Sequence, residues 1–284
     1  MRASMPGSKL DLAFSGPGYG GRSLSPSLMS SMKSGRNVAS TDFIHEARFM
    51  KHALIIGASG GLGGALAHLL LDRGGWQVLG TYHQTEPLWQ HSLMTWRALD
   101  IRAETEIASL MTPLPKIDLL INTTGILTSP YHGPEKSIRQ FNAEHMMMSF
   151  EINTAPILNL AKHAQTALKA SNQPIIVALS ARVGSIADND LGGWYSYRCA
   201  KAALNMAVKT LAIEWQRSLP MATLIAYHPG TVRTALSTPF LKSGSTSVTL
   251  SPGDAAEHCL QLLDTLTPAN TGSFWDWRGQ KIPW

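Results

Sequence analysis

A tyrosine and a lysine four residues apart could perform acid–base chemistry in this chain. Tyr197 and Lys201 lie in the segment YRCAK, at the start of a stretch whose apolar spacing predicts a helix over about 195–217. Four residues advance a helix by about 400°, so the two side chains would share one face about one turn apart. A nearby ammonium stabilises a phenolate and lowers the pKa of the phenol. The pair is therefore predicted to move a proton to or from a substrate oxygen.

A glycine-rich turn about 140 residues before Tyr197 could bind a dinucleotide. It reads GASGGLGG over residues 57–64, follows an apolar run and opens a helical pattern. Missing side chains let the backbone approach a pyrophosphate, and a helix amino terminus offers free N–H groups. A tight strand-to-helix junction could show the same glycines, although the strand before and the helix after favour a nucleotide site. The predicted cofactor-binding residues here are Gly57, Ser59, Gly60, Gly61, Leu62 and Gly63.

Short apolar runs alternate with longer helical patterns from His52 to the end of the chain. The uniformly apolar run 175–179 is typical of a strand buried on both faces, which requires helices above and below a parallel sheet. The sequence therefore predicts an α/β fold: a single Rossmann-type doubly wound parallel sheet of about seven strands with helices on both faces. This domain would span residues 50–284. Its longest helical stretches would be 143–169 and 195–217.

Residues 1–49 are rich in Ser, Gly and Pro and show no sustained apolar period, which predicts a disordered N-terminal extension. The Ser and Arg content of this extension is similar to that of an organelle transit peptide, but Asp42 and Glu46 weaken the similarity. The other interpretation is an extension without a targeting role, with Met50 as an alternative start.

Composition excludes several classes of protein. The 284 residues are 44% hydrophobic and 15% charged, and the net charge of +5 comes from 24 basic and 19 acidic residues. Residues 1–49 hold six of the basic and three of the acidic side chains, so the remainder is nearly neutral and no nucleic-acid partner is predicted. Two isolated cysteines predict neither a disulfide framework nor a metal site. No apolar run approaches the ~20 residues of a membrane span, so a cytoplasmic protein without a membrane partner is expected.

The end of the second predicted strand distinguishes NADP from NAD. An acidic residue there normally binds the free ribose hydroxyls of NAD and repels the 2′-phosphate of NADP. This chain reads GTYHQ over 80–84, with no acid until Glu86. NADP(H) is therefore the predicted cofactor and NAD(H) the less favoured one, with Thr81, Tyr82 and His83 as candidate neighbours of the phosphate. His83 could equally be a solvated loop histidine.

The G-x3-G-x-G turn and the later Y-x3-K motif together resemble the short-chain dehydrogenase/reductase family over nearly all of residues 51–284. The family usually has Thr before the first glycine, where this chain has Ile56. The resemblance implies that Asn153 anchors a water near the lysine, and that Tyr197 and Lys201 also contact the cofactor. The other cofactor-binding residues that it implies are Asp100 and Ile101 beside the adenine, Asn122, Thr123 and Gly125 in an N-x-x-G turn, and Pro229, Gly230, Val232 and Thr234 near the nicotinamide.

The family also implies a serine that holds the substrate oxygen at the end of the fifth strand. The family commonly has a Ser-Ser pair there, whereas this chain reads LSARVGS over 179–185, which aligns Ala181 with the catalytic serine. Either Ser180 or Ser185 would then supply the hydroxyl, and Ser180 is narrowly preferred. If neither reaches the substrate, turnover should be low. The polar segment 235–249 is the expected substrate lid.

The segments SARVGSIADN, GGWYSYR and FWDWRGQKIPW resemble the C-factor branch of the family, which is similar to sniffer-type carbonyl reductases. The resemblance implies an enzyme, an NADP-dependent oxidoreductase that transfers hydride between NADP(H) and a small-molecule carbonyl or secondary alcohol. The alternatives are a nucleotide-binding signalling protein with weak or no turnover, and an NAD-linked alcohol dehydrogenase. Apolar faces on the two long helices predict a homodimer or homotetramer.

Overall fold

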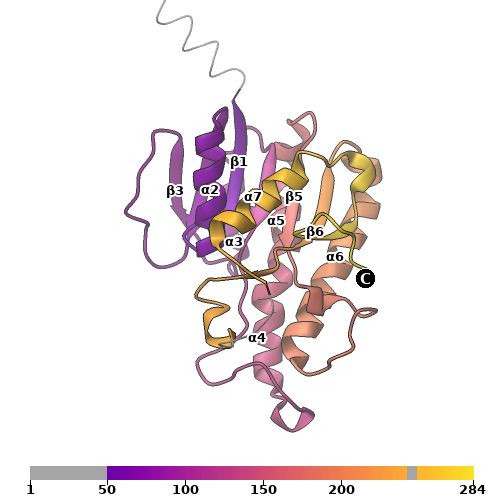
Figure 1. The fold of residues 1–284 in the computed structure, drawn as a ribbon. Coiled ribbons are helices and arrows are strands. Elements are labelled where there is room, and N and C mark those ends of the chain that lie inside the picture. Colours follow the sequence, from indigo (N-terminus) through magenta and orange to yellow (C-terminus); the bar gives the residue numbers. More distant parts are fainter. Residues whose placement is uncertain (1–49, 242–247) are drawn as a thin grey trace, which may run out of the picture. The chain divides into compact units, whose positions relative to one another are not determined.

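The computed structural model describes residues 50–241 and 248–284. The predicted disordered extension and part of the predicted lid lie outside these residues. The described chain forms a seven-stranded sheet with the order β3-β2-β1-β4-β5-β6-β9, in which every neighbouring pair is parallel (Figure 1). The strands are β1 (Lys51–Ile56), β2 (Trp76–Tyr82), β3 (Met94–Ala98), β4 (Leu119–Asn122), β5 (Ile175–Leu179), β6 (Thr223–His228) and β9 (Ser273–Asp276).

Helices cover both faces of the sheet, because alternate strand residues point to opposite sides and both sets are apolar. Ala53 and Ile55 of β1 pack in the core under α2 (Gly61–Arg73) and α7 (Pro252–Leu263). Leu54 and Ile56 pack in the core on the other side. That side is covered by α3 (Glu104–Met111), α5 (Ala155–Lys169) and α6 (Tyr195–Ser218), with α4 (Ala143–Asn153) packed against α6. The predicted doubly wound fold is confirmed.

The predicted helical stretch 143–169 is two helices, α4 and α5, which meet at Thr154. Pro156 lacks the N–H that would continue the α4 hydrogen-bond pattern. Thr154 departs from helical geometry (φ −118°, ψ −59°), and its hydroxyl donates to the carbonyl of Ala200 on α6 at 2.7 Å. The break therefore places Asn153 at the end of α4, beside the helix that carries Tyr197.

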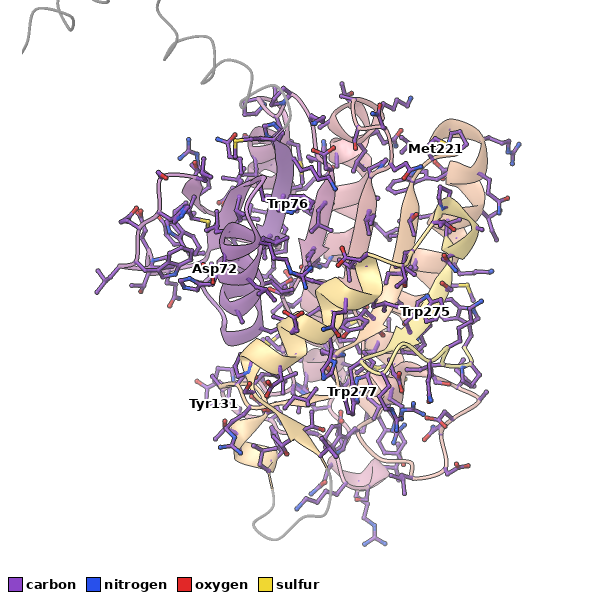
Figure 2. The ribbon with its side chains drawn as sticks, turned by 45° about the horizontal axis from the view of Figure 1, so that its top comes forward. Asp72, Trp76, Tyr131, Met221, Trp275 and Trp277 are labelled. Carbon is purple, nitrogen blue, oxygen red and sulfur yellow. The ribbon has the colours of Figure 1, made fainter. Side chains whose placement is uncertain are left out.

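The C-terminal segment covers the outer edge of β9. Trp275 forms an antiparallel bridge with Lys281, so the edge strand has a partner on its free side. Trp275 and Trp277, both labelled in Figure 2, are partly buried and pack against the core on the α7 side. The ring centroid of Trp277 lies 5.2 Å from that of His258 on α7.

Among the described residues, no helix is both long and apolar enough to cross a membrane.

Candidate active site

A cleft of about 1320 Å³ runs along the carboxyl ends of the strands. This is where ligands bind in doubly wound sheets, at the point where the connections from neighbouring strands diverge. Here β1 has β2 on one side and β4 on the other, so the divergence lies beside the glycine turn. Of the predicted site residues, all line the cleft except Asn122, Asn153 and Ser185.

The glycine turn connects β1 to α2. Gly57 has a left-handed backbone (φ +80°), which glycine adopts without strain. A Cβ on Gly63 would lie only 2.4 Å from the carbonyl oxygen of Gly57, so this position admits no side chain. No side chain caps the start of α2 at Gly60, which leaves its first N–H groups directed towards the cleft. The turn thus has the backbone donors that a pyrophosphate requires.

Two threonines hold this turn. Thr123 donates its hydroxyl to the carbonyls of Ile56 (2.7 Å) and Gly57 (3.2 Å), and Thr81 accepts from the N–H of Gly57 at 2.9 Å. The hydroxyl absent at Ile56 is therefore supplied by Thr123, the residue after β4. Since Thr81 is 2% exposed and bonded to the turn, its principal contact is with the turn itself.

A cluster of charged side chains lies at the end of the cleft where the resemblance predicts the adenine. Asp100 accepts from Arg102 through two bonds, Nε to Oδ1 at 3.0 Å and Nη2 to Oδ2 at 2.6 Å. These bonds lower the pKa of Asp100 to about 2. The Nε2 atom of His83 lies 3.8 Å from the same carboxylate. Arg102 was missed by sequence reasoning; its position two residues after Asp100, just past β3, is the signal that could have found it.

Tyr197 and Lys201 lie on one face of α6, as predicted from their spacing. The Lys201 Nζ is 5.7 Å from the centroid of the Tyr197 ring and donates to the Leu179 carbonyl of β5 at 2.8 Å. Gly184 allows the loop after β5 to lie directly against α6, because a Cβ at residue 184 would lie 2.8 Å from backbone and side-chain atoms of Lys201.

The pKa of Tyr197 differs from the prediction, which is a phenol pKa lowered by the neighbouring ammonium. Burial raises the pKa of Tyr197 and lowers that of Lys201 to about 7. Loss of hydration disfavours the charged form of each group, and it is the cause of both shifts. The phenol of Tyr197 therefore remains protonated near neutral pH.

The lowered pKa of Lys201 predicts how stability depends on pH. Between about 7 and the ordinary value of 10.5, the unfolded chain binds more protons than the folded protein, so stability rises with pH. We expect the free energy of unfolding, measured in urea, to increase by about 1 kcal/mol per pH unit from about pH 7 to about pH 9. Lys201→Met should flatten this rise, and equal slopes in the two proteins would contradict the assignment. Above pH 9 the buried thiol of Cys259, whose pKa burial raises to about 12, stays protonated in the folded protein and ionises in the unfolded chain. Its contribution to stability therefore falls as the pH rises, opposite to that of Lys201.

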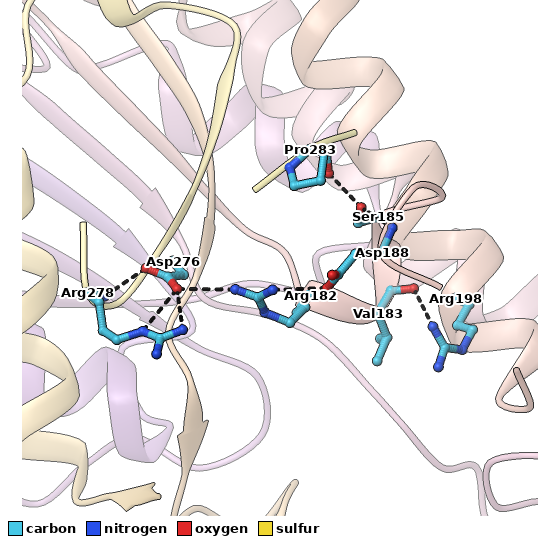
Figure 3. Close-up of polar contacts among 8 residues, drawn as sticks. All are labelled: Arg182, Val183, Ser185, Asp188, Arg198, Asp276, Arg278 and Pro283. Atoms are coloured by element: carbon cyan, nitrogen blue, oxygen red, sulfur yellow. Dashed lines mark hydrogen bonds and ion pairs between the residues drawn. The ribbon is translucent and has the colours of Figure 1, made fainter. Parts of the chain in front are cut away.

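The hydroxyls of both candidate serines donate hydrogen bonds to acceptors within the protein. Ser180 lines the cleft, but it donates to Oδ1 of Asn205 on α6 at 2.7 Å, and the Asn205 amide in turn donates to Gly184. Ser185 is 1% exposed and donates to the carbonyl of Pro283 at 2.6 Å (Figure 3). It does not line the cleft. Ala181, which also lines the cleft, carries no hydroxyl.

Asn153 is buried behind the cleft. Its Oδ1 accepts from the N–H of Ile126, and its Nδ2 donates to the carbonyl of Ile126 and to the Ser149 hydroxyl, each at 3.0 Å. The side chain thus fixes the loop after β4, and a Cβ on Gly125 would clash with it at 2.9 Å. Asn122, at the end of β4, is 5% exposed and accepts from Thr124.

The predicted nicotinamide segment follows β6. Gly230 is left-handed (φ +79°), and a Cβ there would lie 2.8 Å from the Trp277 ring. Val232 belongs to β7 (Thr231–Val232), which pairs with β8 (Thr249–Leu250). The Thr234 side chain packs against the glycine turn, because a Cβ on Gly61 would lie 3.0 Å from its methyl group. The segment therefore contacts the glycine turn directly.

An ion-pair network around one buried carboxylate, which the sequence did not reveal, fixes the loop after β5 (Figure 3). Asp276 is 0% exposed and pairs with Arg182 at 3.2 Å and with Arg278 at 3.1 Å. Arg182 also pairs with Asp188 at 3.0 Å. Although burial opposes it, hydrogen bonds from residues 278 and 280 hold the pKa of Asp276 below its usual value. The network attaches the cleft wall at Arg182 to the C-terminal strand.

A doubly wound parallel sheet, a glycine turn between β1 and α2, and a tyrosine–lysine pair at the same cleft define a dinucleotide-binding oxidoreductase. The short chain dehydrogenase family model matches residues 51–243, and the chain belongs to this family.

Known proteins resemble this chain along most of the domain. The C-signal protein of Myxococcus xanthus is 30% identical over 168 residues, which are 59% of this chain and 93% of that protein. A 1-hydroxy-2-glutathionyl-2-methyl-3-butene dehydrogenase of a Rhodococcus species is 27% identical over 239 residues, 83% of this chain and 100% of that one.

Solved structures share the fold. A short-chain dehydrogenase/reductase of Burkholderia multivorans with bound NADP is 26% identical (TM-score 0.68) and matches 83% of this chain and all of that one. The carbonyl reductase Sniffer of Drosophila melanogaster is 24% identical (TM-score 0.72) with the same coverage. The predicted resemblance to the C-factor and sniffer branch is confirmed.

Proposed function

We propose that this protein reduces a ketone or aldehyde with NADPH. The observation that carries the proposal is a single continuous cleft, in which the glycine turn lies at one part and Tyr197 and Lys201 at another. Bound NADPH would supply the hydride. Tyr197 would donate its proton to the carbonyl oxygen, because its burial keeps the phenol protonated and an alkoxide is more basic than a phenolate.

NADPH oxidation, followed with a panel of aldehydes and ketones, tests this function. We expect turnover on at least one member, with the alcohol formed in equal amount to the NADPH consumed. Failure to bind NADPH would contradict the proposal at its first step.

NADP(H) fits the adenine end of the cleft better than NAD(H). His83 and Arg102 line the cleft there, whereas Glu86, the first acid after β2, does not. A guanidinium forms strong bonds to phosphate oxygens, and Asp100 orients that of Arg102 without occupying all of its donors.

Arg102→Ala is expected to raise the dissociation constant of NADPH by roughly 10-fold, the loss of one charge-assisted contact. The dissociation constant of NADH should change by less than about threefold, because NADH has no 2′-phosphate. Fluorescence titration of both nucleotides measures this. An equal loss of affinity for the two would assign Arg102 to shaping the site, and tighter binding of NADH by the unaltered protein would overturn the cofactor proposal.

We propose that the reaction proceeds without a serine that is free to donate to the substrate, because Asn205 and Pro283 accept the protons of Ser180 and Ser185. Ala181 has an extended backbone (φ −144°, ψ 146°) that accepts any side chain. Ala181→Ser should therefore raise kcat/KM by about 10-fold, by adding the hydroxyl that the family places there. Ser185→Ala should lower stability with little effect on kcat/KM. An unchanged rate in Ala181→Ser together with a 10-fold or larger loss in Ser180→Ala would instead make Ser180 the catalytic serine.

A second candidate function is that of a nucleotide-binding signalling protein. It is favoured by the hydrogen bonds in which both serine hydroxyls donate to protein acceptors and not to a substrate. The similarity to the C-signal protein points the same way. Tight NADPH binding without turnover on any carbonyl, even in Ala181→Ser, would support this candidate over the reductase.

We further propose a homodimer or homotetramer. Met147 of α4 and Met206 of α6 are each 67% exposed, and Ile213 of α6 is 51% exposed. Static light scattering at micromolar concentration tests this, and a monomer mass would contradict it.

A further inference from the structure

Glu135 is a buried carboxylate that lies outside the cleft and takes no part in the proposed mechanism. It belongs to the loop between β4 and α4 and is 2% exposed. Its carboxylate accepts from the N–H of Ser196, at 3.3 Å to each oxygen, and from the Ser196 hydroxyl. Its backbone carbonyl accepts from the N–H of Trp194. Among the described residues no ion pair includes Glu135, and its carboxylate lies at the amino terminus of α6, where the helix dipole favours an acidic side chain.

The residue before α6 has a strained backbone. Gly192 and Gly193 are left-handed (φ +61° and +65°), which suits glycine, and Trp194 continues the same conformation with φ +52° and ψ +42°. Trp194 is the only described residue other than glycine with positive φ. A bulky side chain is disfavoured in this region and persists there only where its surroundings hold it. The backbone carbonyl of Glu135 accepts from the N–H of Trp194 itself, and its carboxylate accepts from Ser196, two residues later.

The strained conformation places an aromatic ring beside the reaction centre. The Trp194 ring centroid lies 6.3 Å from that of Tyr197 and 6.0 Å from that of Phe240, and all three residues line the cleft. The side chain of Trp194 thus forms a wall next to the proposed proton donor.

We propose that Glu135 is a positioning residue that clamps Trp194 in its left-handed conformation, together with the first turn of α6. The clamp holds the Trp194 ring against Tyr197 and Phe240 and so shapes the part of the cleft that receives the substrate. Its effect on catalysis rests on the proposed reductase function, whereas its effect on Trp194 does not.

Near-UV circular dichroism tests the clamp independently of activity. The difference between the spectra of the unaltered protein and Trp194→Phe isolates the contribution of Trp194 in its aromatic surroundings. Glu135→Ala should lose this contribution. Glu135→Gln should retain it, because an amide oxygen can still accept from Ser196. As a matched control, Glu144→Ala removes an exposed acid from the first turn of α4 and should leave the spectrum unchanged.

A thermal denaturation cycle tests whether Glu135 opposes the strain at Trp194. Glu135→Ala should lower Tm by about 3–10 °C. Trp194→Gly removes the strain, so the same substitution in that background should lower Tm by about half as much or less. Equal losses in the two backgrounds would show that Glu135 only caps α6 and would overturn the clamp. If Glu135→Ala does not fold, Ser196→Ala replaces it in the denaturation cycle and in the circular dichroism spectra. This variant removes the hydroxyl donor to Glu135 and keeps the N–H donor.

The kinetic consequence is a loss in kcat/KM for the carbonyl of roughly 10- to 100-fold in Glu135→Ala, with recovery in Glu135→Gln. The dissociation constant of NADPH should stay within about twofold, since the residue is remote from the glycine turn. A folded Glu135→Ala protein with an unchanged Trp194 spectrum and an unchanged kcat/KM would overturn the proposal. If no carbonyl is reduced by the unaltered protein, the reductase function fails, while the spectra and the denaturation cycle still decide the clamp.

Discussion

Tyr197→Phe is expected to lower kcat/KM for carbonyl reduction by about 10²- to 10⁴-fold, the usual contribution of a positioned proton donor. The substitution removes one oxygen atom and keeps the ring, so the packing against Trp194 remains. Hydride transfer would then form an alkoxide without a proton from the protein. The dissociation constant of NADPH should stay within about threefold, as measured by fluorescence titration.

Tyr195→Phe is the matched control for this prediction. Tyr195 lies on the same first turn of α6 but does not line the cleft. Its fourth successor is Cys199, so it has no lysine partner. We expect kcat/KM within about twofold of the unaltered protein. Comparable losses in both variants would indicate that the phenol of Tyr197 acts through folding and not as the donor.

Gly63→Ala is expected to abolish measurable NADPH binding and to lower the free energy of unfolding by about 1–3 kcal/mol. The added Cβ would lie 2.4 Å from the Gly57 carbonyl oxygen, 2.8 Å from the Thr123 hydroxyl and 3.0 Å from the Ala58 Cα. Two of these atoms belong to the backbone, so no side-chain rotation relieves the overlap and the turn must open. Urea denaturation and nucleotide titration measure the two effects.

Gly253→Ala serves as the control for a glycine-to-alanine change in the first turn of a helix. A Cβ there meets nothing closer than 3.7 Å, and the substitution should leave NADPH binding unchanged. It should stabilise the protein by ~0.4–1 kcal/mol, through reduced freedom of the unfolded chain. Normal NADPH affinity in Gly63→Ala would contradict the role assigned to the glycine turn.

The strands, helices and their layering were predictable from the sequence because they depend on local periodicity. Runs such as 175–179 are apolar throughout, and only a parallel sheet covered on both faces buries them. One clear difference, the break at Thr154, follows from a local signal in Pro156 and from a contact with Ala200 that no local pattern reveals.

The electrostatic direction at Tyr197 could not be predicted from its spacing to Lys201. Spacing places the two groups on one face of α6, but the pKa of each depends on how much water reaches it. Burial dominates here, and it raises the pKa of the phenol while lowering that of the amine. The phenol of Tyr197 is therefore protonated near neutral pH, the form that can donate a proton.

The sequence by itself determined the fold class, the glycine turn and the pairing of Tyr197 with Lys201, because each depends on residues close together in the chain. The tertiary structure decided which serine hydroxyls already donate to protein acceptors, and which side chains from distant loops surround the site. Ser185 bonds to Pro283, 98 residues away, and Glu135 to Ser196, 61 residues away. Such contacts form only when the sheet brings distant loops to one edge, since neither partner carries a local signal for the other.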